Sequence, residues 1–363
     1  PVALCLAEMV WEEWGEKIWD EIITGPVSES LKERAFKQLS LLGSTKTGVQ
    51  IGEYLLREDG PLDSVESLVQ PGRAEILSRL SEINPEGAVY LLERNLGVLS
   101  SAELKKINND SRRHIVWALE KISFCPETFE QGAKLMLNLA VAETENYSNN
   151  ATGLFQSFFP VHLGNTEANS DKRFRVIDDA LNTKNEQQLI IVVEALLSGA
   201  KTNFFSRSVG AETHGTRPSR EPWQPKTEDD LWNYIESCCD RLIELSKRTD
   251  DVGAAARKGL GHKFRSLVTR PLTHVAEKAV KEIVAIHGTY WPEAYESLGD
   301  VFAHDIEGIP EENLSRIKKL LIVFQPQTLE DKLQLLVIEM PWDYPCDEKH
   351  SYKERAKIQK EAV

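Results

Sequence analysis

The sequence contains no hydrophobic run that approaches the roughly 20 apolar residues needed to cross a bilayer. It also has no basic segment followed by an apolar one at its start, so no secretory signal is predicted. Cysteine is scarce, and the five cysteines, at positions 5, 125, 238, 239 and 346, include no C-x-x-C pair. An odd number of scattered cysteines in a long chain fits a reducing compartment. We therefore expect a cytoplasmic protein without membrane contact.

Positive charge is also in short supply. Lys and Arg number 43 against 57 Asp and Glu, which gives a net charge of −14. General nucleic-acid binding depends on neutralising phosphates, so an acidic chain is a poor candidate for it.

The motifs that usually carry catalysis are missing too. Residues 43–48, GSTKTG, resemble the opening of a P-loop, but Val49 and Gln50 stand where Lys and Ser/Thr are required. There is no G-x-G-x-x-G after a strand, no H-E-x-x-H and no G-x-S-x-G. The eight histidines are dispersed. We predict no catalytic residue, no metal site and no cofactor, and we expect that this chain is not an enzyme.

What the sequence does contain is a series of amphipathic helices. The clearest part, residues 114–164, reads as three helices joined by short turns. Apolar residues recur at helical spacing, first as Ile115, Ala118, Leu119 and Ile122, then as Phe129, Ala133, Met136, Leu137 and Ala140, and last as Leu154, Phe155, Phe158 and Phe159. We expect Asp110 to cap the first of these helices, Pro126 to lie in the first turn of the second, and Asn149 or Asn150 to cap the third.

The same reading extends over most of the chain. Helices are expected at 28–42, 72–83, 85–96, 170–181, 189–197, 231–247, 251–268, 272–287, 293–303, 311–324 and 328–338, and the apolar runs 320–324 and 333–338 favour buried helix over strand. Helix pairs recur at roughly 35–45 residues, as in helical solenoids. We predict an all-α fold, an α-solenoid of stacked helix pairs of the HEAT or TPR kind.

The predicted organisation has five parts. Helical repeats occupy 1–110, 111–198 and 228–345, a long loop occupies 199–227, and a charged tail follows at 346–363. The chain opens with Pro1 and passes directly into an apolar helix, which suggests a fragment of a longer polypeptide.

The long loop is the first departure from this regular pattern, because structureless loops beyond about 12–15 residues tend to be functional or disordered. Its aromatic and basic residues are candidate partner-binding residues: Phe204, Phe205, Arg207, His214, Arg217, Arg220 and Trp223. Arg and Trp dominate binding hot spots. The alternative is a structural role, in which Phe204, Phe205 and Trp223 pack onto the helices. A catalytic role for His214 has no visible partner to support it.

The second departure is a basic segment, 254–274. It carries Arg257, Lys258, Lys263, Arg265 and Arg270 without an Asp or Glu between them. These residues are a candidate basic patch for phosphate, nucleic acid or an acidic protein. The structural alternative is a charged helix face that balances the acidic residues of 229–244.

Four sequence segments together suggest a family. They are FCPETFEQGAKLMLNLAVAETENYSNNATGLFQSFF at 124–159, REPWQPKT with LWNYI within 220–235, GTYWPEAYESL at 288–298 and MPWDYP at 340–345. They resemble the C-terminal helical-repeat sensor region of bacterial STAND-type (NACHT-like) NTPases of anti-phage defence, over roughly residues 100–345. The resemblance implies a region that binds a phage protein and triggers oligomerisation of the full-length protein, which would carry an NTPase and an effector outside this chain. It fixes no binding residue.

Two classes of function follow. The first is a non-catalytic protein-interaction module whose partner is a protein, for which the resemblance implies a phage origin. The alternative is a helical-repeat nucleic-acid-binding protein that uses the basic patch. Salt dependence would separate them, because phosphate contacts weaken steeply with salt.

Overall fold

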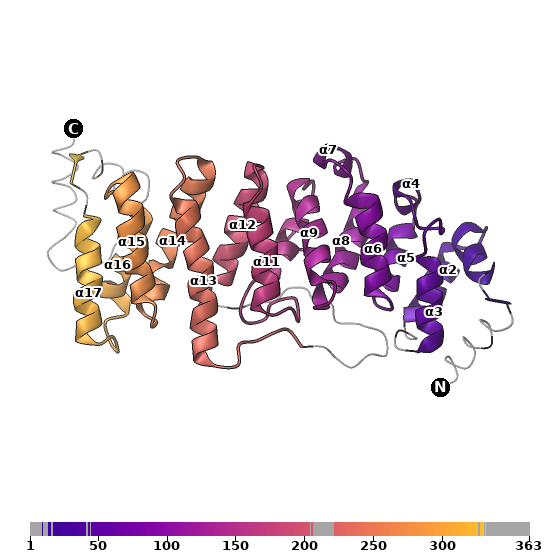
Figure 1. Cartoon of the computed structure of the whole chain (residues 1–363), viewed down its shortest axis with the longest axis horizontal. Helices are drawn as coiled ribbons and strands as arrows, with labels where there is room; N and C mark the ends of the chain where they lie inside the picture. Colours follow the sequence, from indigo (N-terminus) through magenta and orange to yellow (C-terminus); the bar gives the residue numbers. More distant parts are fainter. Residues whose placement is uncertain are drawn as a thin grey trace. The chain divides into compact units, whose positions relative to one another are not determined.

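The structure is a computed structural model that describes residues 9, 14–15, 17–40, 43, 45–203, 205, 221–325, 327–329 and 331. Every regular element among these residues is an α-helix (Figure 1). The chain divides into two compact units. The N-terminal unit holds residues 1–198 and 205–224, and the C-terminal unit holds residues 199–204 and 225–363. The predicted all-α class is therefore confirmed.

The N-terminal unit is built from short helices that pack against their neighbours. Their bounds are α2 Glu29–Ser40, α3 Lys46–Leu55, α4 Val65–Leu68, α5 Arg73–Leu80, α6 Pro85–Leu96, α7 Ser101–Leu104, α8 Asn109–Phe124, α9 Phe129–Val141, α10 Ala151–Ser157, α11 Ser170–Leu181 and α12 Glu186–Gly199. Helices α2, α5 and α8 pack in sequence as one layer, and α6, α9 and α11 pack as a second layer. Helices α8 and α9 join the two layers.

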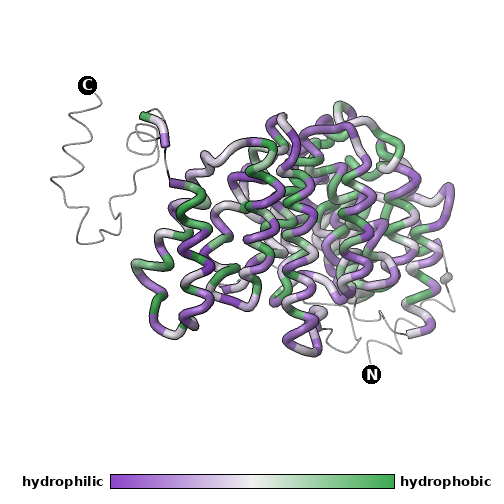
Figure 2. The backbone as a smooth tube through the Cα atoms, turned by 60° about the vertical axis from the view of Figure 1, so that its left-hand side comes forward, coloured by the Kyte–Doolittle hydropathy of each residue, from purple (hydrophilic) through white to green (hydrophobic). Residues whose placement is uncertain are grey.

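The C-terminal unit repeats this arrangement with longer helices. Its helices are α13 Glu228–Ser246, α14 Asp251–Val268, α15 Thr273–His287, α16 Pro292–His304 and α17 Glu311–Val323. One layer contains α13, α15 and α17, and the other contains α14 and α16. Alternation of helices between two layers is the arrangement of stacked helix pairs, so the predicted solenoid architecture holds within each unit. Figure 2 shows hydrophilic and hydrophobic residues alternating along the helices, as amphipathic helices require.

The three helices predicted for residues 114–164 are α8, α9 and α10. Asn150 caps α10, because its side chain accepts a hydrogen bond from Gly153 N at 2.9 Å. The predicted cap of α8 was wrong: Asn108 accepts from Ser111 N at 2.9 Å, and Asp110 lies inside the first turn. Pro126 precedes α9 instead of starting it, since α9 begins at Phe129.

Other helix starts also follow local chemistry. Asn84 caps α6 with Pro85 at the first helical position. Thr227 and Asp230 form a capping box at α13. The apolar run 320–323 is helical within α17, whereas 333–338 lies outside the described residues. The four-residue helix α4 was not predicted, because a single turn gives too short a periodic pattern to recognise.

Aromatic side chains fill the core of each unit. In the N-terminal unit, the ring centroid of Phe155 lies 6.4 Å from that of Phe158 and 5.2 Å from that of Phe159. In the C-terminal unit, Trp291 lies 5.1 Å from Phe264 and 5.7 Å from Phe324. All six rings are buried, so the helices of each unit are held together by shared aromatic clusters.

Replacing Phe155 by Ala should lower the free energy of unfolding by about 3–5 kcal/mol, because it removes a fully buried ring and leaves a cavity. Chemical denaturation measures this change. Val98 is 78% exposed in the same unit, so Val98→Ala is the matched control with an expected effect below about 0.5 kcal/mol. Equal, small effects for both variants would show that the Phe155 stripe is not buried.

Gly261 lies where α14 packs tightly against the start of α16. A Cβ there would lie 2.7 Å from the Trp291 indole nitrogen and 3.0 Å from Ala294 N. We expect Gly261→Ala to destabilise by about 1–3 kcal/mol, as overpacking does. Gly299 on α16 has open space around its Cβ position, so Gly299→Ala should be neutral or stabilising by up to about 1 kcal/mol through helix propensity. Thermal melting of both variants tests the contrast, and equal stability would contradict the tight α14–α16 contact.

Candidate functional site

The connection between α10 and α11, residues 158–169, is held by a buried arginine. Arg173 on α11 is fully buried. Its guanidinium donates hydrogen bonds to the carbonyl oxygens of Ala168 at 2.9 Å, Pro160 at 3.0 Å and Thr166 at 3.3 Å. A buried charged group is costly unless its donors are satisfied, so the backbone of this connection is fixed around Arg173. Gly164 is required beside it, because a Cβ there would lie 2.6 Å from Pro160 O and 3.1 Å from Arg173 Nη2.

The same connection is also tied to α8. The hydroxyl of Thr166 donates to Ser123 O at 2.7 Å, and the backbone N–H of Glu167 donates to Phe124 O at 2.9 Å. The Asn165 amide donates to the buried Glu120 carboxylate at 2.6 Å. Residues 158–169 therefore form a supported platform, not a loose loop.

Leu163 sits on this platform in a strained conformation. Its φ is +55°, in the left-handed region that costs an ordinary side chain about 1–2 kcal/mol. Its side chain is 44% exposed. Because the Leu163 side chain is exposed, the free energy gained by burying it cannot account for the cost of this backbone conformation. Strained residues that are held by rigid surroundings often mark functional positions.

Both described aromatic residues of the long loop return to the platform. The ring of Phe205 lies edge-on to His162, with centroids 4.9 Å apart. Trp223 donates its backbone N–H to Thr166 O at 2.9 Å, and its ring lies 5.0 Å from the Arg173 guanidinium carbon. We call His162, Leu163, Phe205 and Trp223 the aromatic patch. All four belong to the N-terminal unit.

The structural and the functional interpretation of the long loop concern the same two described residues, Phe205 and Trp223. Phe205 and Trp223 are half-buried and pack onto the helical unit, as the structural interpretation expected. Phe205 contacts His162, the residue that precedes the exposed Leu163. The other candidate residues, Phe204, Arg207, His214, Arg217 and Arg220, lie outside the described residues. No sequence pattern predicted a role for Leu163 or Arg173, because a left-handed leucine and a buried arginine both arise from tertiary contacts.

The candidate basic patch is partly used inside the C-terminal unit. Arg257 donates to Ser246 O at 2.8 Å and to Arg248 O at 2.7 Å. Arg265 donates to Asp305 at 2.6 Å and lies 3.4 Å from Asp300. The hydrogen bond to Asp305 raises the pKa of Arg265.

The other members of the basic patch differ in exposure. Lys258 and Arg270 are exposed, and Lys263 is half-buried. The two arginines that are engaged internally contact the end of α13 and α16, so the five residues do not share one role.

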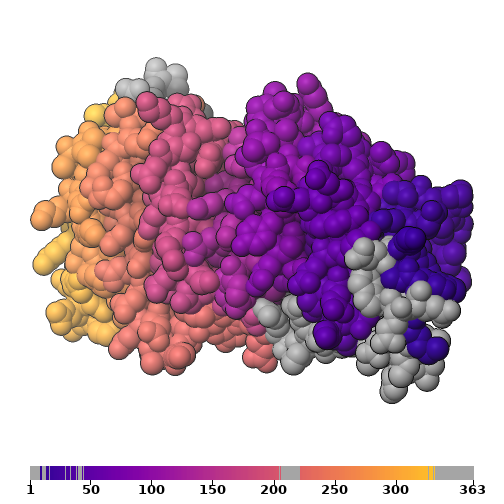
Figure 3. Space-filling view, turned by 45° about the vertical axis from the view of Figure 1, so that its right-hand side comes forward, coloured from indigo at the N-terminus to yellow at the C-terminus, as the bar shows by residue number. Residues whose placement is uncertain are grey.

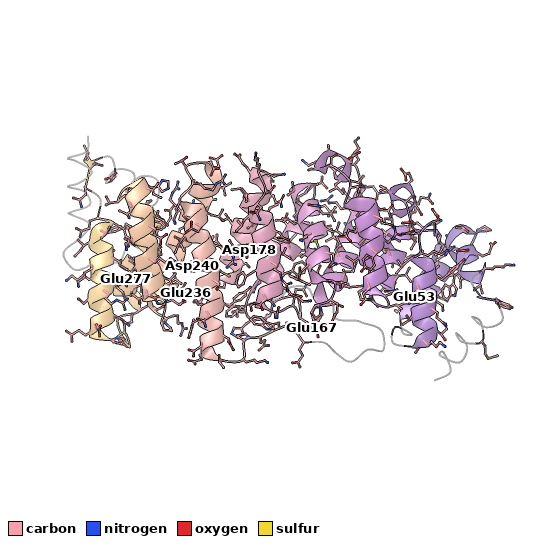
Figure 4. The ribbon with its side chains drawn as sticks, in the orientation of Figure 1. Glu53, Glu167, Asp178, Glu236, Asp240 and Glu277 are labelled. Carbon is pink, nitrogen blue, oxygen red and sulfur yellow. The ribbon has the colours of Figure 1, made fainter. Side chains whose placement is uncertain are left out.

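The acidic residues of α13 pair chiefly with α15. Glu236 lies 3.2 Å from His274, and Asp240 accepts from Lys278 at 2.9 Å. Arg316 of α17 donates to Glu277 of α15 at 2.7 Å. Figure 4 labels these three acids on α13 and α15. The charged side chains thus link neighbouring helices of one layer through α15.

A serine and a lysine meet between α5 and α8. Lys121 Nζ lies 3.2 Å from Ser78 Oγ and is paired with the buried Glu82 carboxylate. Burial lowers the pKa of Lys121, and Glu82 opposes this by stabilising the ammonium. Ser78 is itself buried. Because Lys121 is paired with Glu82, it stays an ammonium and cannot act as the base that would activate Ser78. We therefore interpret these three residues as an internal ion pair with a hydrogen-bonded serine, not as a nucleophilic site.

Among the described residues, no three His, Cys, Asp or Glu side chains are grouped so that they could hold a metal ion. In the same part of the chain, no helix has the length and apolar character needed to cross a membrane.

Comparison with known proteins adds no identification. No protein-family model matches the chain, and a search of curated proteins also gave no match. The resemblance to STAND-type sensor regions remains a prediction from the sequence phrases.

Arg173→Lys should lower the free energy of unfolding by at least about 2 kcal/mol, because an ammonium cannot reproduce the fork of bonds to three carbonyl groups. Arg175 on the same helix is 59% exposed and is paired with Glu130 at 3.4 Å. Arg175→Lys is therefore the matched control, with an expected effect below about 0.5 kcal/mol. Urea denaturation of both variants decides the point, and an Arg173→Lys protein as stable as the control would remove Arg173 as the support of the platform.

Proposed function

We propose that the chain is a non-catalytic, helical-repeat protein-interaction module and that the aromatic patch contacts its protein partner. The observation that carries this proposal is Leu163, an exposed apolar side chain held in a strained backbone conformation on a supported platform. The half-buried aromatic rings of Phe205 and Trp223 pack on the same platform, against His162 and the Arg173 guanidinium. The aromatic patch therefore presents apolar surface in a fixed geometry, so little conformational entropy is lost when a partner binds it.

The proposal includes a biological setting. The sequence phrases that resemble STAND-type sensor regions support a role as the target-sensing part of a larger bacterial anti-phage defence protein in the cytoplasm. The first of these phrases, 124–159, forms α9, α10 and the start of the platform. In this proposal the partner is a phage protein, and its binding favours oligomerisation of the full-length polypeptide.

The nucleic-acid alternative has less support. Its candidate residues Arg257 and Arg265 already donate to carbonyl and carboxylate groups within the C-terminal unit. Those bonds would have to be exchanged for phosphate contacts, so the gain from binding would be reduced. This alternative remains a prediction.

Leu163→Asn tests the aromatic patch directly. Asn tolerates the left-handed conformation, so the variant should fold with unchanged or slightly higher stability while it loses the apolar side chain. The full chain, immobilised, is exposed to lysate from phage-infected and uninfected bacteria. We expect wild-type protein to retain a phage-encoded protein that Leu163→Asn retains at least tenfold less, which corresponds to the loss of a hot-spot side chain.

Val98→Asn is the matched control, because Val98 is an exposed apolar residue elsewhere in the N-terminal unit. It should retain the same protein as wild type. Equal retention by Leu163→Asn and wild type would contradict a role for the aromatic patch, as would retention that depends on nucleic acid in the lysate.

A further inference from the structure

A hollow on the N-terminal unit lies away from the aromatic patch in sequence and is lined by Glu58, Tyr90, Glu93 and Arg94. Its volume is about 510 Å³, and it is an open depression of the surface, not an enclosed cavity. Tyr90, Glu93 and Arg94 come from α6, where residues three and four apart share one face. Glu58 comes from the turn that follows α3. The space-filling view shows the closely packed surface of this unit from one side (Figure 3).

Tyr90 is the apolar part of this hollow. Its side chain is 57% exposed although it lies in the middle of α6. Large aromatic side chains gain free energy by burial, so an exposed ring in a hollow is available for a ligand to cover.

The turn that carries Glu58 is fixed by its own hydrogen bonds. Asp59 has φ +55°, and its backbone N–H donates to the Asp63 carboxylate at 2.9 Å. Asp tolerates this left-handed conformation better than most residues. Glu58 is therefore presented from a defined turn beside α6.

The charge of the hollow is negative. Its one cation, Arg94, donates to Asp63 at 2.8 Å, and Asn95 donates to the same oxygen at 2.9 Å. The charge of Arg94 is therefore neutralised by Asp63, not by Glu58 or Glu93. Both of these carboxylates are exposed, and within the described part of the chain neither makes an ion pair.

We infer that this hollow binds an arginine side chain of a protein partner, with the guanidinium between the Glu58 and Glu93 carboxylates and over the Tyr90 ring. A planar guanidinium can donate to carboxylates and stack on an aromatic ring at the same time. The Glu58 and Glu93 carboxylates repel anionic ligands, and a neutral ligand would not pair with their charge. The inference rests on the proposed function only in that it needs a protein partner, because the hollow and the aromatic patch share no residue.

The test uses the full chain labelled with 3-fluorotyrosine and the probe N-acetyl-arginine amide. Tyr90→Phe assigns the Tyr90 signal in the ¹⁹F spectrum. We expect that signal to shift saturably, with a Kd of about 1–10 mM for a single side chain, and to shift less at 0.5 M salt because the carboxylates are screened. N-acetyl-citrulline amide, which has the same shape without the charge, should leave the signal in place.

The double variant Glu58→Gln and Glu93→Gln should weaken binding roughly fivefold, the sum of two exposed charge contacts. Glu127→Gln, an exposed carboxylate between α8 and α9, is the matched control and should bind as wild type does. The inference is overturned if the Tyr90 signal stays fixed, if it responds equally to citrulline, or if the double variant binds as tightly as wild type. No partner protein is present in this titration, so its failure is distinct from a failure of the aromatic patch.

Discussion

A completely buried guanidinium has five N–H bonds and must find acceptors for them. Arg173 finds its acceptors in the backbone carbonyl groups of the connection between α10 and α11. This requirement determines the path of residues 158–169, the need for Gly164, and the position where Trp223 can stack. The exposed Leu163 is held in place by the same constraint.

A second buried arginine is used in a related way near the other end of α9. Arg112 on α8 is fully buried and donates to Leu139 O at 2.6 Å and to Leu104 O at 3.3 Å. Glu143 lies 3.7 Å from it. In both cases a buried guanidinium donates hydrogen bonds to backbone carbonyl groups of neighbouring segments. These directional bonds orient the segments, which apolar contacts alone cannot do. The helices supply the stacked scaffold, and the buried arginines fix how the connections cross it.

The fold could largely be predicted because each helix carries a periodic apolar stripe and a recognisable start. Asn84 with Pro85, and Thr227 with Asp230, are local signals that act over three residues. The cap of α8 was misplaced because Asn108 and Asp110 are both suitable by type, and only the hydrogen bond to Ser111 distinguishes them. Helix α4 is one turn long and gives no periodicity.

The candidate site was predictable only in part. The aromatic residues of the long loop were recognised by type, and Phe205 and Trp223 pack where a structural role would place them. Leu163 and Arg173 have no sequence signature, since strain and burial depend on residues far along the chain. The same holds for the basic patch: five cations in sequence suggested one surface, whereas Arg257 and Arg265 turn to different partners in the fold.

The central claim is that residues 158–169 and Trp223 form a fixed platform, and amide hydrogen exchange tests it most directly. The N–H groups of Asn165, Glu167 and Trp223 donate to backbone carbonyls at 2.9 Å. Their exchange should be slowed to the level of the α8 amides, because opening them requires breaking the Arg173 network. Exchange of these three amides at the rate of an unprotected loop, while α8 stays protected, would contradict the account.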